Sequence, residues 1–341
     1  MTRNVTTSLR TTLTRIASVA GIAAVFGIVA ATATAPTRAD TLRWKAEGWQ
    51  TDFDTASVDL DRILSGGPPR DGIPSIDNPV FEFVPGHDDL APTDPVVGVT
   101  IGGDARAYPL RILTWHEIVN DVVGDTPIAV TYCPLCNSAP VFERTVDGRV
   151  LEFGVSGKLK DSNLIMYDRQ TETWWQQFTG EAIVGELTGT LLELVPARLQ
   201  SWAEFAEQNP NGRVLVPSNA RMRDYGRNPY VSYDTSLPFL YDGQLPEDIN
   251  PMERVVIVPR KGADPFLITM NAIAEEGQIE RDGLTLSWNA GQASALDSAR
   301  IAQGRDVGTV LVQRQGADVP YDVTFAFVAH AFHPGVAIAR D

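Results

Sequence analysis

Cysteine is scarce in this chain, since its 341 residues include only Cys133 and Cys136, and histidine occurs four times. The sequence also has no glycine-rich phosphate loop, no Rossmann fingerprint and no His-Glu-x-x-His motif, so no nucleotide cofactor is expected. Basic residues are outnumbered, 28 against 43 acidic, for a formal net charge of −15. Such a charge repels phosphate backbones, which argues against nucleic acid as a partner and leaves the partner unknown.

The first 39 residues have the features of a signal peptide. Three arginines within the first 15 residues precede an uncharged run from Ile16 to Ala31, and residues 37–39 include small side chains suited to cleavage. The sequence therefore predicts an exported protein, periplasmic or extracellular, with anchoring through an uncleaved signal as the alternative. No later run reaches the roughly 20 apolar residues of a membrane-spanning helix, so no further transmembrane helix is expected.

Glycine and proline are plentiful and scattered, at 28 and 23 residues, in a chain that is 43% hydrophobic. This pattern breaks the chain into short elements and predicts an α+β fold that is predominantly β, with hairpin-connected strands and a few short helices. We expect an irregular N-terminal segment over residues 40–70 and a single β-rich domain over 71–341. No fixed-period repeat is visible.

Several local patterns predict particular elements. Two apolar runs around glycines predict a hairpin at 95–108, and Asp147-Gly148 predicts another at 140–153. Ser201, with Glu204 three residues later, predicts a capped helix over 201–208. The spacing of Ile112, Trp115, Val119 and Val122 predicts a helix that carries His116 and Glu117. We also expect strands at 284–288, 307–312 and 323–329, the last leading into His330 and His333.

The two cysteines follow directly on the β-branched run 126–132, so a strand end presents them. Around them stand Trp115-His116-Glu117-Ile118-Val119-Asn120-Asp121, Thr131-Tyr132-Cys133-Pro134-Leu135-Cys136-Asn137 and Tyr167-Asp168-Arg169-Gln170-Thr171. With these strings the chain resembles the bacterial and archaeal family called domain of unknown function 3179, from about Asp71 to about Pro334. The resemblance implies an exported or membrane-associated protein without an established activity.

A Cys-x-x-Cys pair can hold a soft metal, cycle between dithiol and disulfide, or form a structural staple. The first hypothesis is a copper or zinc site with Cys133 and Cys136 as thiolate ligands and His116 and His333 as imidazole ligands. Glu117 or Asp121 would then orient those ligands. A disulfide across two intervening residues constrains the unfolded chain little, which favours a functional pair over a staple.

Two other functions remain open at this stage. In a thiol-disulfide oxidoreductase, the more exposed cysteine attacks and the other resolves. In a glycan- or peptide-binding module, the cysteines form a structural disulfide and the region of Trp174 and Trp175 contacts the ligand. On a strand, one of these two rings would be core and the other surface. Ordinary hairpin and loop chemistry is the favoured interpretation of Ser156, Lys158, Asn163, Asp168 and Arg169, which could otherwise line a polar pocket.

Overall fold

The computed structural model describes residues 38–340, and the predicted signal peptide lies almost entirely outside them. The fold is α+β and predominantly β, as the sequence predicts, with five short α-helices among the described residues. These helices are α1 (Arg38–Ala46), α2 (Leu110–His116), α3 (Trp202–Gln208), α4 (Met270–Glu276) and α5 (Ala326–Phe332). None of the helices within 38–340 is long and apolar enough to cross a bilayer.

One sheet is built around the predicted hairpin β3–β4, and its strand order is β15-β3-β4-β16-β2. The strands are β2 (Val80–Phe83), β3 (Pro95–Ile101), β4 (Asp104–Pro109), β15 (Ala197–Ser201) and β16 (Arg213–Val216). Strand β4 runs directly into α2, and β15 runs directly into α3. Ser201 caps α3 through the predicted capping box with Glu204.

A second sheet follows α2 and has the strand order β14-β7-β6-β5. Its strands are β5 (Ile118–Val123), β6 (Thr126–Thr131), β7 (Val141–Glu143) and β14 (Leu194–Val195). The loop with both cysteines joins β6 to β7. The predicted helix therefore ends six residues early, and residues 118–123 form a strand because their β-branched side chains pack well on a pleated surface. Asn120 and Asp121 are strand residues, which corrects their assignment to a helix end.

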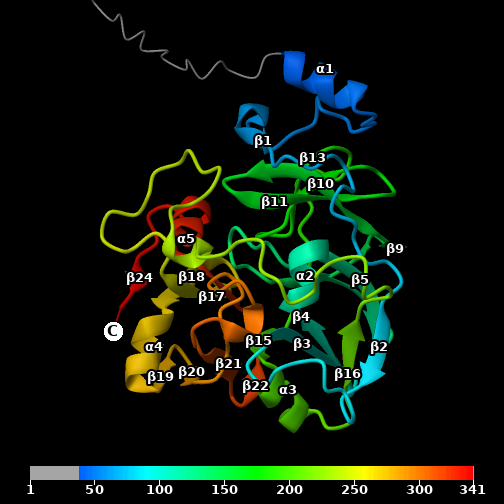
Figure 1. Ribbon diagram of the computed structural model, residues 1–341. Coiled ribbons are helices and arrows are strands. Elements are labelled where there is room, and N and C mark those ends of the chain that lie inside the picture. The colour runs from blue at the N-terminus through cyan, green and yellow to red at the C-terminus, as the bar shows by residue number, and fades with distance from the viewer. Residues whose placement is uncertain (1–37, 341) are drawn as a thin grey trace, which may run out of the picture. The chain divides into compact units, whose positions relative to one another are not determined.

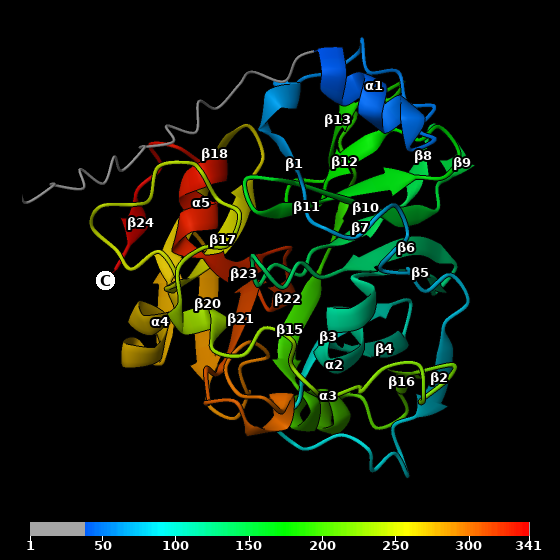
Figure 2. The ribbon, with the colours of Figure 1, turned by 45° about the horizontal axis from the view of Figure 1, so that its top comes forward.

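The C-terminal part repeats this arrangement with two further four-stranded sheets, ordered β23-β17-β18-β24 and β19-β20-β21-β22 (Figure 2). The strands are β17 (Arg254–Arg260), β18 (Ala263–Thr269), β19 (Gln278–Arg281), β20 (Leu284–Asn289), β21 (Thr309–Arg314), β22 (Ala317–Asp318), β23 (Asp322–Phe325) and β24 (Ile338–Ala339). Strand β18 runs directly into α4, and β23 runs directly into α5. Residues 326–332 are thus helical, which corrects the strand predicted at 323–329, because a short apolar run fits either structure.

We call residues 95–216 the first repeat and residues 254–339 the second repeat. In both, a strand of seven residues, a two-residue turn and a second strand precede a helix of seven residues, and another hairpin with a two-residue turn follows. The parallel pair β4–β16 corresponds to β18–β24, and the antiparallel pair β15–β3 corresponds to β23–β17. The chain therefore contains a repeat of topology that its residue pattern does not reveal.

The first repeat contains an insertion between β7 and β14, which the second repeat lacks. The inserted strands are β8 (Thr145–Val146), β9 (Arg149–Val150), β10 (Phe153–Lys160), β11 (Asn163–Asp168), β12 (Trp174–Gln176) and β13 (Glu181–Val184). Strands β8 and β9 flank the predicted Asp147-Gly148 turn. Strands β10 to β13 form a sheet that β1 (Ile63–Ser65) completes at one edge, beside β10 and close to α1 (Figure 1).

The N-terminal segment packs its aromatic side chains on this inserted sheet. Trp44, Trp49 and Phe53 surround the Trp174 ring at 4.9–5.2 Å between ring centroids. The segment predicted to be irregular thus includes α1 and β1. Trp174 and Trp175 are both fully buried, which corrects the expectation that one ring is exposed and removes the proposed ligand platform.

Candidate functional site

The cysteine loop, residues 132–140, is a tight turn at the end of β6. The N–H of Cys133 donates to the Ser138 carbonyl at 2.9 Å, and the N–H of Cys136 donates to the Cys133 carbonyl at 3.1 Å. Asn137 takes a positive φ of 52°, which asparagine tolerates better than most residues. The backbone therefore places both sulfur atoms on one side of a small closed loop.

Strand β23 of the second repeat holds this loop in place. The Asp322 carboxylate accepts hydrogen bonds from the Ala139 N–H at 3.0 Å and from the Ser138 hydroxyl. The Thr324 hydroxyl and the Phe325 N–H both donate to the Cys136 carbonyl, at 2.7 and 3.2 Å. Burial raises the pKa of Asp322 to about 6, although these hydrogen bonds oppose the increase.

The insertion covers the cysteine loop from the other side with the turn between β10 and β11. The Cys136 thiol lies 3.4 Å from the Ser162 carbonyl oxygen, and the Cys133 thiol lies 3.9 Å from the same oxygen. The Asn163 side-chain amide donates to the Cys136 sulfur at 3.4 Å. Both cysteines are buried thiols enclosed by two separate parts of the chain.

The pKa values of the two thiols shift in opposite directions. Burial raises the pKa of both thiols, and for Cys136 the adjacent Cys133 sulfur raises it further, well above its usual range. For Cys133, hydrogen bonds from the Cys136 thiol and from backbone amides, including that of Leu164, outweigh burial and lower the pKa. Cys133 is therefore the first of the two thiols to ionise, and its thiolate would accept a hydrogen bond from the Cys136 thiol.

A pocket of about 80 Å³ lies against Cys133. Its lining combines the cysteine loop, the end of α2, the insertion, the N-terminal segment and the linker between the repeats: Gly66, Pro68, Ile73, Glu117, Cys133, Pro134, Leu135, Val155, Gly157, Lys158, Leu159, Leu164 and Tyr230. Cys136 is not among these residues. Cys133 is therefore the sulfur that a ligand in the pocket would meet first.

Glu117 supplies a carboxyl group to this pocket. Its backbone carbonyl accepts the Tyr132 N–H at 2.8 Å, which extends the β5–β6 pairing and places Glu117 beside the cysteine loop. Burial raises the pKa of Glu117 well above its usual range, and the negative charge of Cys133 adds to the increase. The side chain is thus a neutral acid over a pH range in which an exposed glutamate is ionised.

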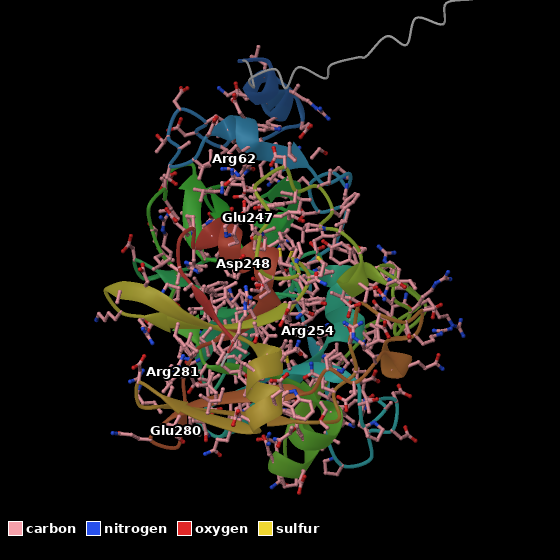
Figure 3. All side chains as sticks on the ribbon, turned by 90° about the vertical axis from the view of Figure 1, so that its left-hand side faces the viewer. Arg62, Glu247, Asp248, Arg254, Glu280 and Arg281 are labelled. Carbon is pink, nitrogen blue, oxygen red and sulfur yellow. The ribbon has the colours of Figure 1, made fainter. Side chains whose placement is uncertain are left out.

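A buried polar group adjoins the other side of the loop. The Tyr132 hydroxyl has no hydrogen-bond partner among the described residues, and burial raises its pKa well above the usual range. Arg254, labelled in Figure 3, is buried nearby and forms an ion pair with Asp234 at 3.2 Å. The Tyr233 hydroxyl, next to Asp234, donates to the Leu135 carbonyl at 3.0 Å. The linker therefore supports the cysteine loop directly through Tyr233, and Arg254 of β17 pairs with the neighbouring Asp234.

His116 and His333 do not join the cysteines, contrary to the four-ligand hypothesis. His116 Nδ1 donates to the Pro74 carbonyl at 2.7 Å, and Nε2 accepts from the Tyr225 hydroxyl at 2.8 Å. Burial lowers the pKa of His116, consistent with a neutral ring. His333 ends α5, and its ring lies 6.0 Å from that of Phe178. Within residues 38–340, no three His, Cys, Asp or Glu side chains are placed to hold a metal ion.

The remaining predicted residues take part in local hydrogen bonding. Asp121 accepts hydrogen bonds from Arg106 at 2.7 Å and from the Tyr108 hydroxyl at 2.6 Å. Asp168 accepts from the Trp175 indole at 2.9 Å and from Thr171, and Ser156 donates to the Ile165 carbonyl. These contacts match the ordinary loop and hairpin chemistry that the sequence favours for Ser156 and Asp168.

Fold and site together define a strand-rich α+β protein that encloses a Cys-x-x-Cys pair between two topological repeats. Residues 70–336 match the family described as "Protein of unknown function (DUF3179)", and the chain belongs to that family. This confirms the resemblance noted in the sequence over nearly the same span. No curated protein and no solved structure matches the chain.

Sequence reasoning missed Tyr230 and included Asn163 only among residues that could line a polar pocket. Tyr230 comes from the linker, far along the chain, and reaches the pocket at Cys133. Asn163 follows the positive-φ residues Asp161 and Ser162 in the turn that covers Cys136. Neither belongs to a motif, so only the fold brings them to the cysteines.

Proposed function

We propose that the protein is a thiol-disulfide oxidoreductase whose redox pair is Cys133 and Cys136. The observation that carries this proposal is the difference between the two sulfurs: Cys133 lines a pocket and has a lowered pKa, whereas Cys136 lies behind it with a raised pKa. A thiolate is the attacking species in disulfide exchange, and a neighbouring thiol serves as the resolving group. The pair therefore has a nucleophile and a resolving thiol in defined positions.

In the proposed reaction, the Cys133 thiolate attacks one sulfur of a substrate disulfide and displaces the other as a thiolate. The Cys136 thiol then loses its proton and attacks Cys133, which forms the Cys133–Cys136 disulfide and releases the second substrate thiolate. Two electrons pass from the cysteine pair to the substrate, which is reduced to two thiols once protonated. The same steps in reverse oxidise a dithiol substrate.

The pocket restricts which disulfides can reach Cys133. A volume of about 80 Å³ accommodates a small disulfide or one sulfur-bearing side chain of a larger substrate. Tyr230 lines this pocket and belongs to the linker, residues 217–253, which exposes apolar side chains including Leu237 and Phe239. Larger substrates therefore require the linker to move away from the pocket.

Copper or zinc binding remains a second proposal, reduced to the two sulfur ligands. Thiolates are ligands for Cu(I) and zinc, but both ring nitrogens of His116 already have hydrogen-bond partners. A metal held here would need its remaining ligands from outside the set predicted by the sequence.

The proposal is tested by reacting the reduced protein with 2-hydroxyethyl disulfide and measuring intact mass. The wild type should form an internal disulfide without a lasting adduct. Cys136→Ser should retain the adduct on Cys133, and Cys133→Ser should react slowly because Cys136 is buried and protonated. Each variant leaves one cysteine in the chain. Denatured Cys133→Ser is the matched control, because its single cysteine, Cys136, is then exposed and should react fully with the disulfide. Equal reactivity of the two folded variants would contradict the proposal.

A further inference from the structure

Glu117 occupies an unusual backbone conformation at the end of α2. Its φ is 58° and its ψ is −31°, which lies outside the small left-handed region available to residues with a Cβ atom. At the corresponding place in the second repeat, directly after α4, stands Gly277 with φ 74° and ψ −41°. Both helices end in the same strained conformation, but only the second repeat has the residue that adopts it readily.

The Glu117 side chain is unfavourable as well. Glu117 is only 7% exposed, and its Oε2 atom is buried without a hydrogen-bond partner among the described residues. Burial of a polar group without a partner costs stability, as does backbone strain. Features of this kind that reduce stability are concentrated at functional sites, and Glu117 lines the same pocket as Cys133.

We propose that Glu117 transfers protons to and from the sulfur atoms that react at Cys133. This inference rests on the proposed thiol-disulfide exchange and adds a proton donor and acceptor to it. Three independent observations carry it: the strained backbone where the other repeat has glycine, the unpartnered carboxylate oxygen, and the pocket shared with Cys133.

Glu117 gives up and regains one proton in each reaction. When the Cys133 thiolate attacks a dialkyl disulfide, the neutral Glu117 carboxyl gives its proton to the departing alkanethiolate, which leaves as a thiol. The Glu117 carboxylate then takes the proton of the Cys136 thiol, and Cys136 attacks Cys133 and displaces the second alkanethiolate. Glu117 is again neutral at the end, and the second alkanethiolate takes its proton from water.

The test compares two small reagents that differ in their need for a proton. 2-Hydroxyethyl disulfide releases an alkanethiolate, which leaves faster when it is protonated, whereas iodoacetamide releases iodide, which needs no proton. Glu117→Gln, which keeps the shape but cannot give up a proton, should slow the exchange by about 100-fold, the low end for general acid catalysis. The rate at which iodoacetamide alkylates Cys133 in this variant should stay within about twofold of the wild-type rate. Its pH dependence should give the same lowered pKa for the Cys133 thiol.

Two outcomes would overturn the inference. A Glu117→Gln variant that slows both reagents equally would show a structural role alone, and one that slows neither would show no role. If instead wild-type Cys133 fails to react with the disulfide, the proposed function itself fails, so the two failures are distinguishable.

A second variant keeps the inference testable if Glu117→Gln does not fold. Glu117→Gly introduces the residue that the second repeat has at this place, so the variant should unfold at a higher denaturant concentration than the wild type. Its disulfide exchange should be slowed as much as that of Glu117→Gln. A lower unfolding midpoint would contradict the claim that Glu117 is retained at a cost to stability.

Discussion

The hairpin β5–β6 of the first repeat and its counterpart β19–β20 in the second follow the same helix and turn geometry but differ in burial. Strand β5 is buried except for Val122, whereas Gln278, Glu280 and Arg281 of β19 are exposed. The Asn120 side chain on β5 exchanges hydrogen bonds with the Phe153 backbone on β10, so the insertion covers β5. The second repeat has no insertion, and β19 of its hairpin faces solvent.

The loops after these hairpins differ in the same way. In the first repeat, residues 132–140 carry the cysteines beneath the inserted sheet, while residues 290–308 of the second repeat contain no cysteine. Strand β23 of the second repeat nevertheless supports the cysteine loop through Asp322 and Thr324. One repeat therefore carries the cysteines, and the other holds their loop in place.

The largest expected effect comes from truncating equivalent core residues of the two helices. Leu113 on α2 and Ile273 on α4 are both fully buried, so substituting either by alanine should lower the free energy of unfolding by about 2–5 kcal/mol. Only Leu113→Ala should also slow exchange with 2-hydroxyethyl disulfide, because α2 leads into Glu117 in the pocket at Cys133, whereas α4 leads into Gly277. Urea unfolding measures the loss of stability, and the disulfide-exchange rate of the folded fraction measures the effect on the site. If Ile273→Ala slows exchange as much as Leu113→Ala does, the distinction between the repeats is wrong.

The second prediction concerns the pH dependence of the contact between the repeats. The pKa of Asp322 is raised from 3.8 to about 6, so the folded state binds more protons between these values and stability falls as pH rises through them. Asp322→Asn stays neutral, and near pH 7 it should exceed the wild type by up to roughly 3 kcal/mol in free energy of unfolding. The difference in free energy of unfolding between Asp322→Asn and the wild type should disappear near pH 4.

A matched control for this prediction lies on β22. The Arg198 guanidinium, with Gln313, holds the pKa of Asp318 below its usual range against the effect of burial. Asp318→Asn should therefore be less stable than the wild type at pH 7, the opposite sign. If the stability difference between Asp322→Asn and the wild type does not change with pH, Asp322 does not titrate as described.

The third prediction exchanges the residues that end α2 and α4. Glu117→Gly should stabilise the protein by about 1 kcal/mol, and Gly277→Glu should destabilise it by about 1–3 kcal/mol through backbone strain. A Cβ atom at Gly277 would meet no other atom within 4 Å, so strain is the main cause there. Chemical denaturation measures both variants, and unchanged stability in Gly277→Glu would disprove the equivalence of the two helix ends.

The smallest expected effect concerns access to the thiol. Tyr230→Ala removes a ring from the pocket over Cys133 and should raise the rate of iodoacetamide alkylation a few-fold, with little change in the pH at which the rate is half-maximal. Tyr225→Phe, which removes only the hydroxyl bonded to His116, is the control from the same linker and should leave the rate unchanged. A faster reaction in both variants would indicate general loosening of the linker.

Local signals in the sequence were sufficient for the hairpin at 95–108, the Asp147-Gly148 turn and the capped helix, although β7 (Val141–Glu143) pairs with β6 and β14 instead of the strand after that turn. Asp147 and Gly148 adopt positive φ angles of 48° and 75° that this residue pair favours, and Ser201 forms the predicted capping box. The signals failed at Glu117, where a helix ends at a residue that ordinarily continues one, and at residues 326–332, where an apolar run permits strand or helix. Tertiary packing decides both.

For the site, the sequence identified the two cysteines, their strand end and Glu117, but not their surroundings. His116 and His333 were chosen as ligands from residue type, while the fold gives His116 to Pro74 and Tyr225 and places His333 beside Phe178. Tyr230 and Asn163 reach the cysteines through contacts between distant segments, which no short-range spacing encodes. The repeat was hidden because the insertion and the linker separate its equivalent strands by long stretches of unrelated sequence.

The most direct test of the account is the equilibrium between the dithiol and disulfide forms of Cys133 and Cys136 in glutathione buffers, with metal analysis on the same samples purified without chelator. The account predicts a reversible two-electron transition with a midpoint above about −300 mV and no stoichiometric metal. A midpoint below that value, as structural disulfides have, would contradict it. One copper or zinc ion per chain that is lost in Cys133→Ser would contradict it equally.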